Sequence, residues 1–238
     1  MTGRGVYTLS KMTDSVEARD PRVAAEQGKP PGKRERLIAA ACQAVYEHGI
    51  EKTTLADIAA AAGIPLGNVY YYFKTKDDII QAVIDVRLGK IRAQLTAIED
   101  KYDTPAGRLK ALFGALGEQA GSIARYGCPD GSLCMELDKR VGNPTLAAQL
   151  IRAPLDWVER QFLDMGRPDA ADLAIQVIAR YQGTALLTNT FRDPDLMARE
   201  ADRIAQWIDA LDLTEDGSDA TAGRDRLRQP PRRERQSR

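Results

Sequence analysis

The chain has very few of the residues from which metal sites and disulfide frameworks are built. Its 238 residues include one histidine, His48, and three cysteines, Cys42, Cys128 and Cys134. A zinc site of the usual cysteine and histidine kind needs more ligands than these, so we expect no metal. Three cysteines are also too few and odd in number for a disulfide framework, which fits a reducing compartment.

Net charge and long apolar runs are absent as well. Lys plus Arg and Asp plus Glu both number 34, so any surface that attracts nucleic acid must be local. No run of about eighteen apolar residues is present, which argues against a membrane-spanning helix. The first residues also lack the apolar stretch of a secretory signal. We therefore expect a cytoplasmic protein that has no membrane partner.

Both ends of the chain are polar. Residues 1–32 show no sustained apolar period and finish on Pro30, Pro31 and Gly32, and residues 214–238 are rich in arginine. Segments of this composition bury too little apolar surface to fold. We therefore expect a disordered leader over 1–32 and a disordered basic tail over 214–238.

The core between them reads as all-α. Its apolar residues fall at helical spacing, with glycine, proline, asparagine and aspartate at the breaks, and no convincing strand is found. A hydrophobic content of 43% is enough to fill an interior. In the first helix, which we expect to end near Gly49, His48 is predicted to be a packed helix-end residue.

Two short helices joined by a glycine turn follow. Thr54 and Asp57 have the spacing of a capping box, which starts a helix that reaches Gly63. Pro65 has a fixed φ suited to the first turn of the next helix. This arrangement, over about residues 54–73, is typical of a helix-turn-helix whose second helix enters the major groove of DNA.

The second helix carries side chains suited to DNA. Gly67 lets the backbone come close to the groove, and the Asn68 amide can read adenine or bind a phosphate. Tyrosine hydroxyls at 70–72 can bond phosphates, and Lys74 and Lys76 add charge. Val69 and Phe73 should pack inward. Taken alone, the aromatic cluster would be read as a stripe of a helical core, but the whole motif favours DNA binding.

These residues carry a family resemblance. The stretch TTLADIAAAAGIPLGNVYYYFKTKDDII, within residues 33 to about 90, resembles the DNA-binding domain of the TetR family of repressors. The resemblance implies a recognition helix over Leu66–Tyr72 and phosphate contacts from Thr54 and Lys76. It also implies a homodimer and a divergent helical C-terminal domain for dimerisation and ligand binding.

One departure from the family pattern bears on specificity. Many members have serine and lysine where this chain has Pro65 and Leu66, which predicts more apolar base contacts here, such as contacts to thymine methyl groups. The full set that we expect to bind DNA is Thr54, Pro65, Leu66, Gly67, Asn68, Tyr70, Tyr71, Tyr72, Lys74 and Lys76.

Together these observations predict a ligand-responsive transcription regulator, a repressor that a small-molecule effector releases from a near-palindromic operator. We expect a DNA-binding domain over 33–91 and a helical effector-binding and dimerisation domain over 92–213.

One alternative is a helical enzyme. The sequence contains no nucleophile with a base, no metal cluster and no glycine-rich phosphate loop, so we expect no enzymatic activity and no cofactor. A scaffold that binds protein and no DNA is the third possibility.

The C-terminal half is less specific. Its last two helices, at about 170–190 and 195–211, are rich in apolar residues and are predicted to pair with their copies in a four-helix dimer interface. We expect that interface to include Ile204, Trp207 or Ile208. Candidate effector or sensor residues are Cys128, Cys134, Arg180, Tyr181 and Asn189.

Residues 126–134 are predicted to form a loop, because they combine two glycines with a proline. The thiol of Cys128 should then be more accessible than those of Cys42 and Cys134. The loop is similar to the Gly-Cys loop of some TetR-family members, a few of which respond to thiol-reactive compounds. Cys128 is therefore a candidate thiol sensor, and the alternative is an inert packing cysteine.

Overall fold

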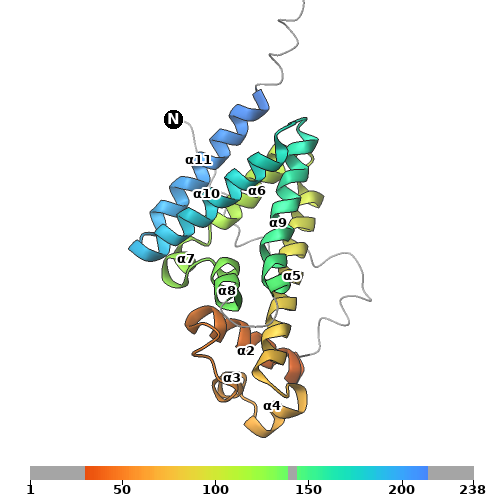
Figure 1. Ribbon diagram of the computed structural model, residues 1–238, viewed down its shortest axis with the longest axis vertical. Coiled ribbons are helices and arrows are strands. Elements are labelled where there is room, and N and C mark those ends of the chain that lie inside the picture. The colour runs from red at the N-terminus through yellow and green to blue at the C-terminus, as the bar shows by residue number, and fades with distance from the viewer. Residues whose placement is uncertain (1–29, 139–143, 214–238) are drawn as a thin grey trace, which may run out of the picture.

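The computed structural model describes residues 30–138 and 144–213 (Figure 1). Within these ranges the regular structure is helical and contains no strand, which confirms the predicted all-α fold. Nearly all of the predicted leader and the whole predicted tail lie outside the described residues. None of the described helices is both long and apolar enough to cross a bilayer.

The helices form two connected groups. At one end of the molecule lie the first three, and α5 runs from them into the other group, where α10 and α11 lie side by side (Figure 1). The helices are α2 (Lys33–His48), α3 (Leu55–Ala62), α4 (Leu66–Tyr72), α5 (Lys76–Lys101), α6 (Pro105–Gly117), α7 (Ala120–Tyr126), α8 (Pro129–Asp138), α9 (Pro144–Asp164), α10 (Ala170–Phe191) and α11 (Pro194–Leu213).

Local chemistry explains where several helices begin. Thr54 and Asp57 form the predicted capping box at the start of α3, and Thr75 with Asp78 forms a second one at the start of α5. Thr104 accepts a hydrogen bond from a backbone N–H in the first turn of α6. Each of these bonds satisfies a helix-end donor that would otherwise have no partner in the helix.

The core consists of two apolar clusters that share α5. One cluster joins α2, α3, α4 and the start of α5, and it also takes in Leu133 from α8 and Leu150 from α9. The other is built from α6, α7, α9, α10 and α11 around Trp157 and Phe162. Because α8 contributes to the first cluster, a movement of α8 is transmitted to the N-terminal helices by packing.

Two local predictions are wrong. The loop expected over 126–134 is limited to Gly127 and Cys128 between α7 and α8, since proline is tolerated in the first turn of a helix and Pro129 begins α8. His48 does not pack against the core. Its side chain is 63% exposed and lies 3.8 Å from Glu47, because the inward face of α2 is occupied by other residues, Leu37, Ile38, Ala41 and Val45.

Candidate nucleic-acid interface and effector region

A tight turn joins α3 to α4. Gly63 has a φ of +61°, a left-handed conformation that glycine adopts without steric cost. The N–H groups of Gly63 and Ile64 donate to the carbonyl oxygens of Ala60 and Ala59, at 3.1 and 2.9 Å. These bonds end α3 and fix the direction in which α4 leaves it.

One face of α4 is anchored in the core and the other is open. Val69 is fully buried and Phe73 nearly so, as predicted. On the outer face Leu66, Tyr70 and Tyr71 are 40%, 48% and 77% exposed. Single exposed apolar side chains are common, but three large exposed side chains on one short helix form a face that is suited to contact with a partner.

The remaining candidates on α4 lie on or beside this open face. Pro65 and Gly67 are exposed, whereas Asn68 and Tyr72 are half-buried. A Cβ atom at Gly67 would meet nothing within 4 Å. The free fold therefore does not require glycine at this position, and the close approach of a partner is a better reason for it.

The three candidates for phosphate contact already have partners within the chain. The Thr54 hydroxyl donates to the Asp57 carboxylate at 2.6 Å, and the Lys74 ammonium donates to the Tyr70 carbonyl oxygen at 2.8 Å. The Lys76 ammonium donates to a carbonyl oxygen in the turn after α2 at 3.2 Å. These exposed or half-exposed bonds position the side chains at the edge of α4, and a phosphate would have to displace or share them.

Comparisons with known proteins agree with this geometry. The family model described as "Bacterial regulatory proteins, tetR family" matches residues 37–83. The HTH-type transcriptional regulator TtgR of Pseudomonas putida is 44% identical over 82 residues, which is 34% of this chain and 39% of that relative. Over this N-terminal region the chain is similar to regulators of the TetR family.

The likeness extends at lower identity over the rest of the molecule. An HTH-type transcriptional regulator of Lactococcus lactis is 27% identical over 186 residues, 71% of this chain and 89% of that protein. The crystal structure of a TetR transcriptional regulator from Legionella pneumophila matches with a TM-score of 0.68 and 22% identity, over 75% of this chain and 98% of that one. The proteins that this chain resembles over most of its length are thus regulators of transcription.

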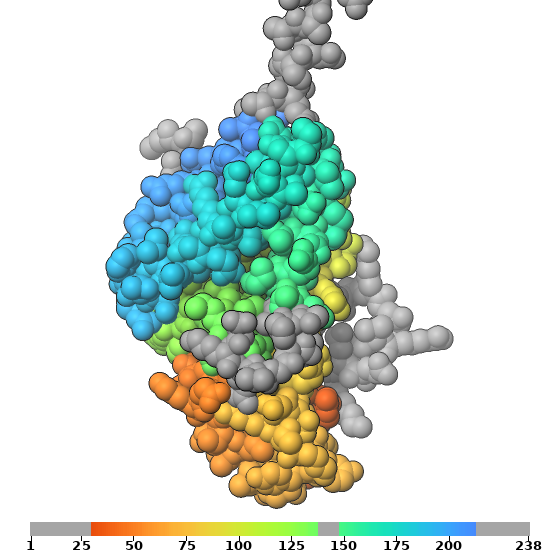
Figure 2. Space-filling view, viewed as in Figure 1, coloured from red at the N-terminus to blue at the C-terminus, as the bar shows by residue number. Residues whose placement is uncertain are grey.

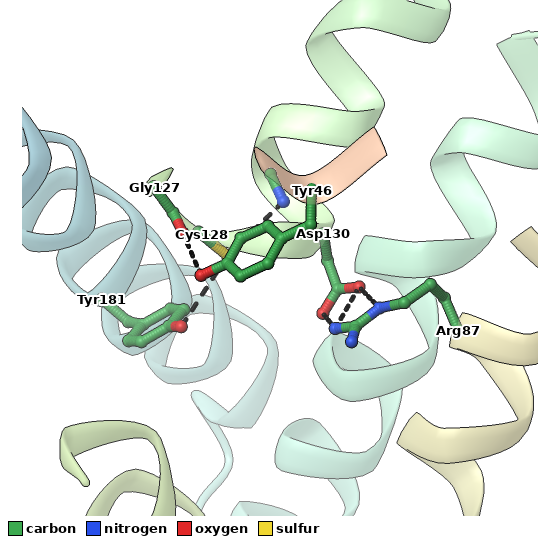
Figure 3. A network of polar contacts seen from close by, with 7 residues as sticks. Tyr46, Arg87, Gly127, Cys128, Asp130 and Tyr181 are labelled. Carbon is green, nitrogen blue, oxygen red and sulfur yellow. Dashed lines mark hydrogen bonds and ion pairs between the residues drawn. The ribbon is translucent and has the colours of Figure 1, made fainter. Parts of the chain in front are cut away.

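Among the effector candidates, Cys128 and Tyr181 are in contact. The Tyr181 hydroxyl donates to the Cys128 sulfur at 3.7 Å, and the Gly131 N–H donates to the same sulfur at 3.4 Å (Figure 3). Burial, together with the Cys128 sulfur, raises the pKa of Tyr181. Cys128 is only 6% exposed, whereas Cys42 and Cys134 are less buried. The expected order of thiol access is therefore wrong, and the argument for Cys128 as an accessible sensor fails.

The other effector candidates have partners of their own, and Asn189 lies beside Gly127, the residue before Cys128. Arg180 forms an ion pair with Glu200 of α11, and the Asn189 amide donates to two carbonyl oxygens of α7, at 3.3 and 3.2 Å. Cys134 is half-buried, and burial raises the pKa of its thiol to about 11. In the part of the chain that the structure describes, no His, Cys, Asp or Glu residues are grouped so as to hold a metal ion.

Of the three alternatives predicted for the dimer contact, two are buried within the chain and the third is partly buried. Ile204 and Ile208 are buried against the same chain, and Trp207 packs partly on the same core, with its ring 5.9 Å from that of Phe162. The apolar face of α11 is therefore used within the monomer. Large exposed apolar side chains lie instead on α10, which covers much of the face in Figure 2: they are Ile175, Leu186, Leu187 and Phe191.

The structure adds a set of residues that sequence reasoning missed. They join α8 and the turn before it to the N-terminal helices. The Arg87 guanidinium of α5 binds the Asp130 carboxylate of α8 through two hydrogen bonds of 2.9 Å (Figure 3). The Glu136 carboxylate, two turns further along α8, accepts the Ile50 N–H at 2.5 Å. Because these two residues lie on a helix that reaches α2 and α5, they could have been found only if residues 129–138 had been read as a helix.

Proposed function

We propose that this protein is a ligand-responsive repressor of the TetR family that binds a near-palindromic operator as a homodimer. The observation that carries the proposal is α4, a short helix with a buried anchor at Val69 and an open face at Leu66, Gly67 and Tyr70. A slim helix presented in this way fits the major groove. The free fold leaves room for a side chain at Gly67, and the lack of one there lets the backbone of α4 come close to DNA.

In this proposal each protomer has two parts. Residues 33–91 bind DNA, and residues 92–213 bind the effector and pair with the second protomer through the exposed face of α10. Two-fold symmetry would place the two copies of α4 about one turn of DNA apart, which is why the operator should be close to palindromic. The protein would act in the cytoplasm, where operator DNA is found, and would need no enzymatic activity or cofactor.

Effector control is supported by the way the two parts are joined. α5 belongs to both apolar clusters, and α8 is bonded to both α5 and the end of α2. An effector that favours another position of α8 would therefore change the orientation of the N-terminal helices relative to the rest of the molecule. A coupling free energy of about 1 to 3 kcal/mol is typical of such control.

The test begins with an operator selected from random duplex DNA by the full-length protein. Asn68→Ala should weaken binding to the selected duplex by about 1 to 3 kcal/mol and leave binding to unrelated duplex nearly unchanged, because the amide reads base edges. Binding is measured by fluorescence anisotropy over a range of salt concentrations. A reporter gene behind the same operator should be silenced by the protein.

Lys76→Ala serves as the contrasting variant. It should weaken binding to all duplexes alike and reduce the salt slope by about one, since a lysine at this edge contacts phosphates rather than bases. If both variants bound the selected duplex as the parent does, α4 would not be the recognition helix. If the reporter were activated, the protein would be an activator and the repressor assignment would be lost.

A further inference from the structure

A cavity of 780 Å³ lies where the N-terminal helices meet the rest of the molecule. Its walls come from α2 and α5 on one side and from α7, α8 and the residue just before α7 on the other. Small-molecule sites commonly have volumes of about 300 to 1,000 Å³. None of the five effector candidates predicted from sequence lines this cavity, so it is a separate site.

One part of the lining is apolar and aromatic. The rings of Tyr46 and Tyr126 lie with their centroids 5.3 Å apart and their planes tilted by 59°. Such a pair offers both ring faces and ring edges to a flat or chain-like apolar group. Apolar side chains and one thiol complete this part of the lining: Ile38, Cys42, Val45, Val83, Val86 and Leu133.

Two cations from α5 reach the same walls. The Lys90 ammonium makes no hydrogen bond or ion pair with any residue that the structure describes. Arg87 uses Nε and Nη2 for Asp130, which leaves its Nη1 without an acceptor among those residues. Burial raises the pKa of Cys42, and the charges of Lys90 and Arg87 oppose that rise. The charges of both cations therefore reach the Cys42 thiol, which forms part of the cavity wall.

The carboxylates of the lining form no ion pair with these two cations and have other partners. Glu136 accepts the Ile50 N–H, and Glu47 accepts an amide N–H from one turn earlier on α2. A carboxylate oxygen of Glu35 lies beside Gly32, at the start of α2, where the helix dipole favours negative charge. The two donors of α5 that these carboxylates leave without an acceptor, Nζ of Lys90 and Nη1 of Arg87, are both cationic.

We propose that this cavity is the effector site and that it takes a small amphipathic organic anion. The carboxylate of the ligand binds at Lys90 and Nη1 of Arg87, and its aromatic or aliphatic body lies against Tyr46, Tyr126 and the valines of α5. The proposal rests on the proposed function and deepens it by naming the site and the ligand class, and it places the effector between the two parts, against α2 and α5 as well as against residues 92–213. An unpaired anion would not be stable among these walls without the two cations.

Occupancy of this site acts on the helices that carry α4. Tyr46 and Arg87 line the cavity and also hold the two bonds that tie α2 and α5 to the region of Gly127 and Asp130. A ligand that moves either side chain changes the position of α2 relative to α8. The site therefore couples to DNA binding through a direct structural path.

The test uses 2-naphthoate as the anionic probe, with decanoate as an aliphatic one and 2-naphthylmethylammonium as the cationic counterpart of the first. Binding to the full-length protein is measured by calorimetric titration without DNA. Both carboxylates should bind with a Kd below about 1 mM, and the ammonium compound should bind at least about tenfold more weakly, because its charge would lie beside Lys90 and Nη1 of Arg87.

Two variants locate the bound probe. Lys90→Gln should weaken 2-naphthoate binding by about threefold to tenfold, whereas Arg92→Gln, which removes an exposed charge from the same helix outside the cavity, should not change it. Ala39→Trp places a large ring in the cavity from an exposed position of α2 and should abolish binding. Circular dichroism and thermal melting confirm that each variant is folded.

Three results would overturn the proposal: no binding of either carboxylate at about 1 mM, equal binding of anion and cation, or unchanged binding in Ala39→Trp. Operator affinity is measured separately. A probe that binds in the cavity and leaves operator affinity unchanged would also overturn the assignment of this site to the effector. If the protein selected no operator at all, the proposed function would fail while the binding titrations still reported on the site.

Discussion

The hydroxyl group of Tyr46, on α2, donates a hydrogen bond of 3.1 Å to the carbonyl oxygen of Gly127 (Figure 3). Gly127 ends α7 with a φ of +86°, and α8 begins two residues later. The bond therefore links the helix that supports the DNA-binding motif to the turn between two helices of the other part, across 81 positions of the sequence.

Removal of this bond should loosen the link without unfolding the protein. We expect Tyr46→Phe to lower the free energy of unfolding by about 1 kcal/mol, because it deletes one half-buried hydrogen bond and keeps the ring. Urea denaturation measures the change. Tyr126→Phe is the matched control, since its hydroxyl has no hydrogen-bond partner among the described residues. Equal stability of parent and Tyr46→Phe would mean that the bond contributes nothing.

The ion pair of Arg87 and Asp130 gives a pH-dependent prediction. Burial raises the pKa of Asp130, and Arg87 opposes the rise. Arg87→Met leaves the carboxylate poorly solvated and unpaired, and it should lower the free energy of unfolding by about 2 kcal/mol at neutral pH. The side chains are 25% and 20% exposed, so the loss should be below that of a fully buried pair.

Acid should restore part of that loss. Without Arg87 the pKa of Asp130 rises further, so the folded state of the variant takes up a proton at a higher pH than the unfolded state does. In the variant, the contribution of the Asp130 carboxyl group to stability is therefore greatest at low pH. It is lost as the pH rises through the pKa that this group has in the folded state. The difference between parent and Arg87→Met should shrink between about pH 7 and pH 4. A constant difference over this range would contradict the account.

Local chemistry made much of the DNA-binding motif predictable from sequence. The capping box of Thr54 and Asp57 and the turn at Gly63 involve residues only a few positions apart, so their consequences do not depend on the rest of the fold. The inward packing of Val69 and Phe73 followed from helical spacing in the same way. All of these features lie where predicted.

Features that depend on distant residues were not predictable. Cys128 is buried because α10 brings Tyr181 to its sulfur from 53 positions away. An apolar face can also be covered by the same chain or by a second copy, and the sequence does not say which. Ile204 and Ile208 were assigned to the dimer interface for this reason, whereas the structure buries both within the monomer.

Gly67→Ala tests whether glycine at this position is required for DNA binding or for folding. The added Cβ meets nothing in the free protein, and alanine is a better helix former, so the variant should be more stable by about 0.5 to 1 kcal/mol. The same methyl group would stand between α4 and the floor of the groove, and operator affinity should fall by about tenfold or more. Gly114→Ala, at another helical glycine with free space, should gain stability alone. Unchanged operator affinity in Gly67→Ala would show that DNA does not approach this position.

The exposed face of α10 should form the contact between two copies of the chain. Ile175 and Leu186 lie eleven positions apart, on one face of the helix, and Leu186 is 65% exposed. Gly183 lies near them with open space above it, which allows a second helix to approach closely. Leu186→Asp places a charge in this contact, and charges are depleted from the centre of such interfaces.

We therefore expect Leu186→Asp to be monomeric at micromolar concentration by light scattering and to bind the selected operator far more weakly, because both half-sites are needed for full affinity. The monomer itself should keep its fold, since a substitution at an exposed position usually changes stability by less than about 0.5 kcal/mol. Met135→Asp, at a position that is also exposed but lies on α8, is the control and should stay dimeric. A Leu186→Asp variant that remains dimeric and binds the operator like the parent would place the interface elsewhere.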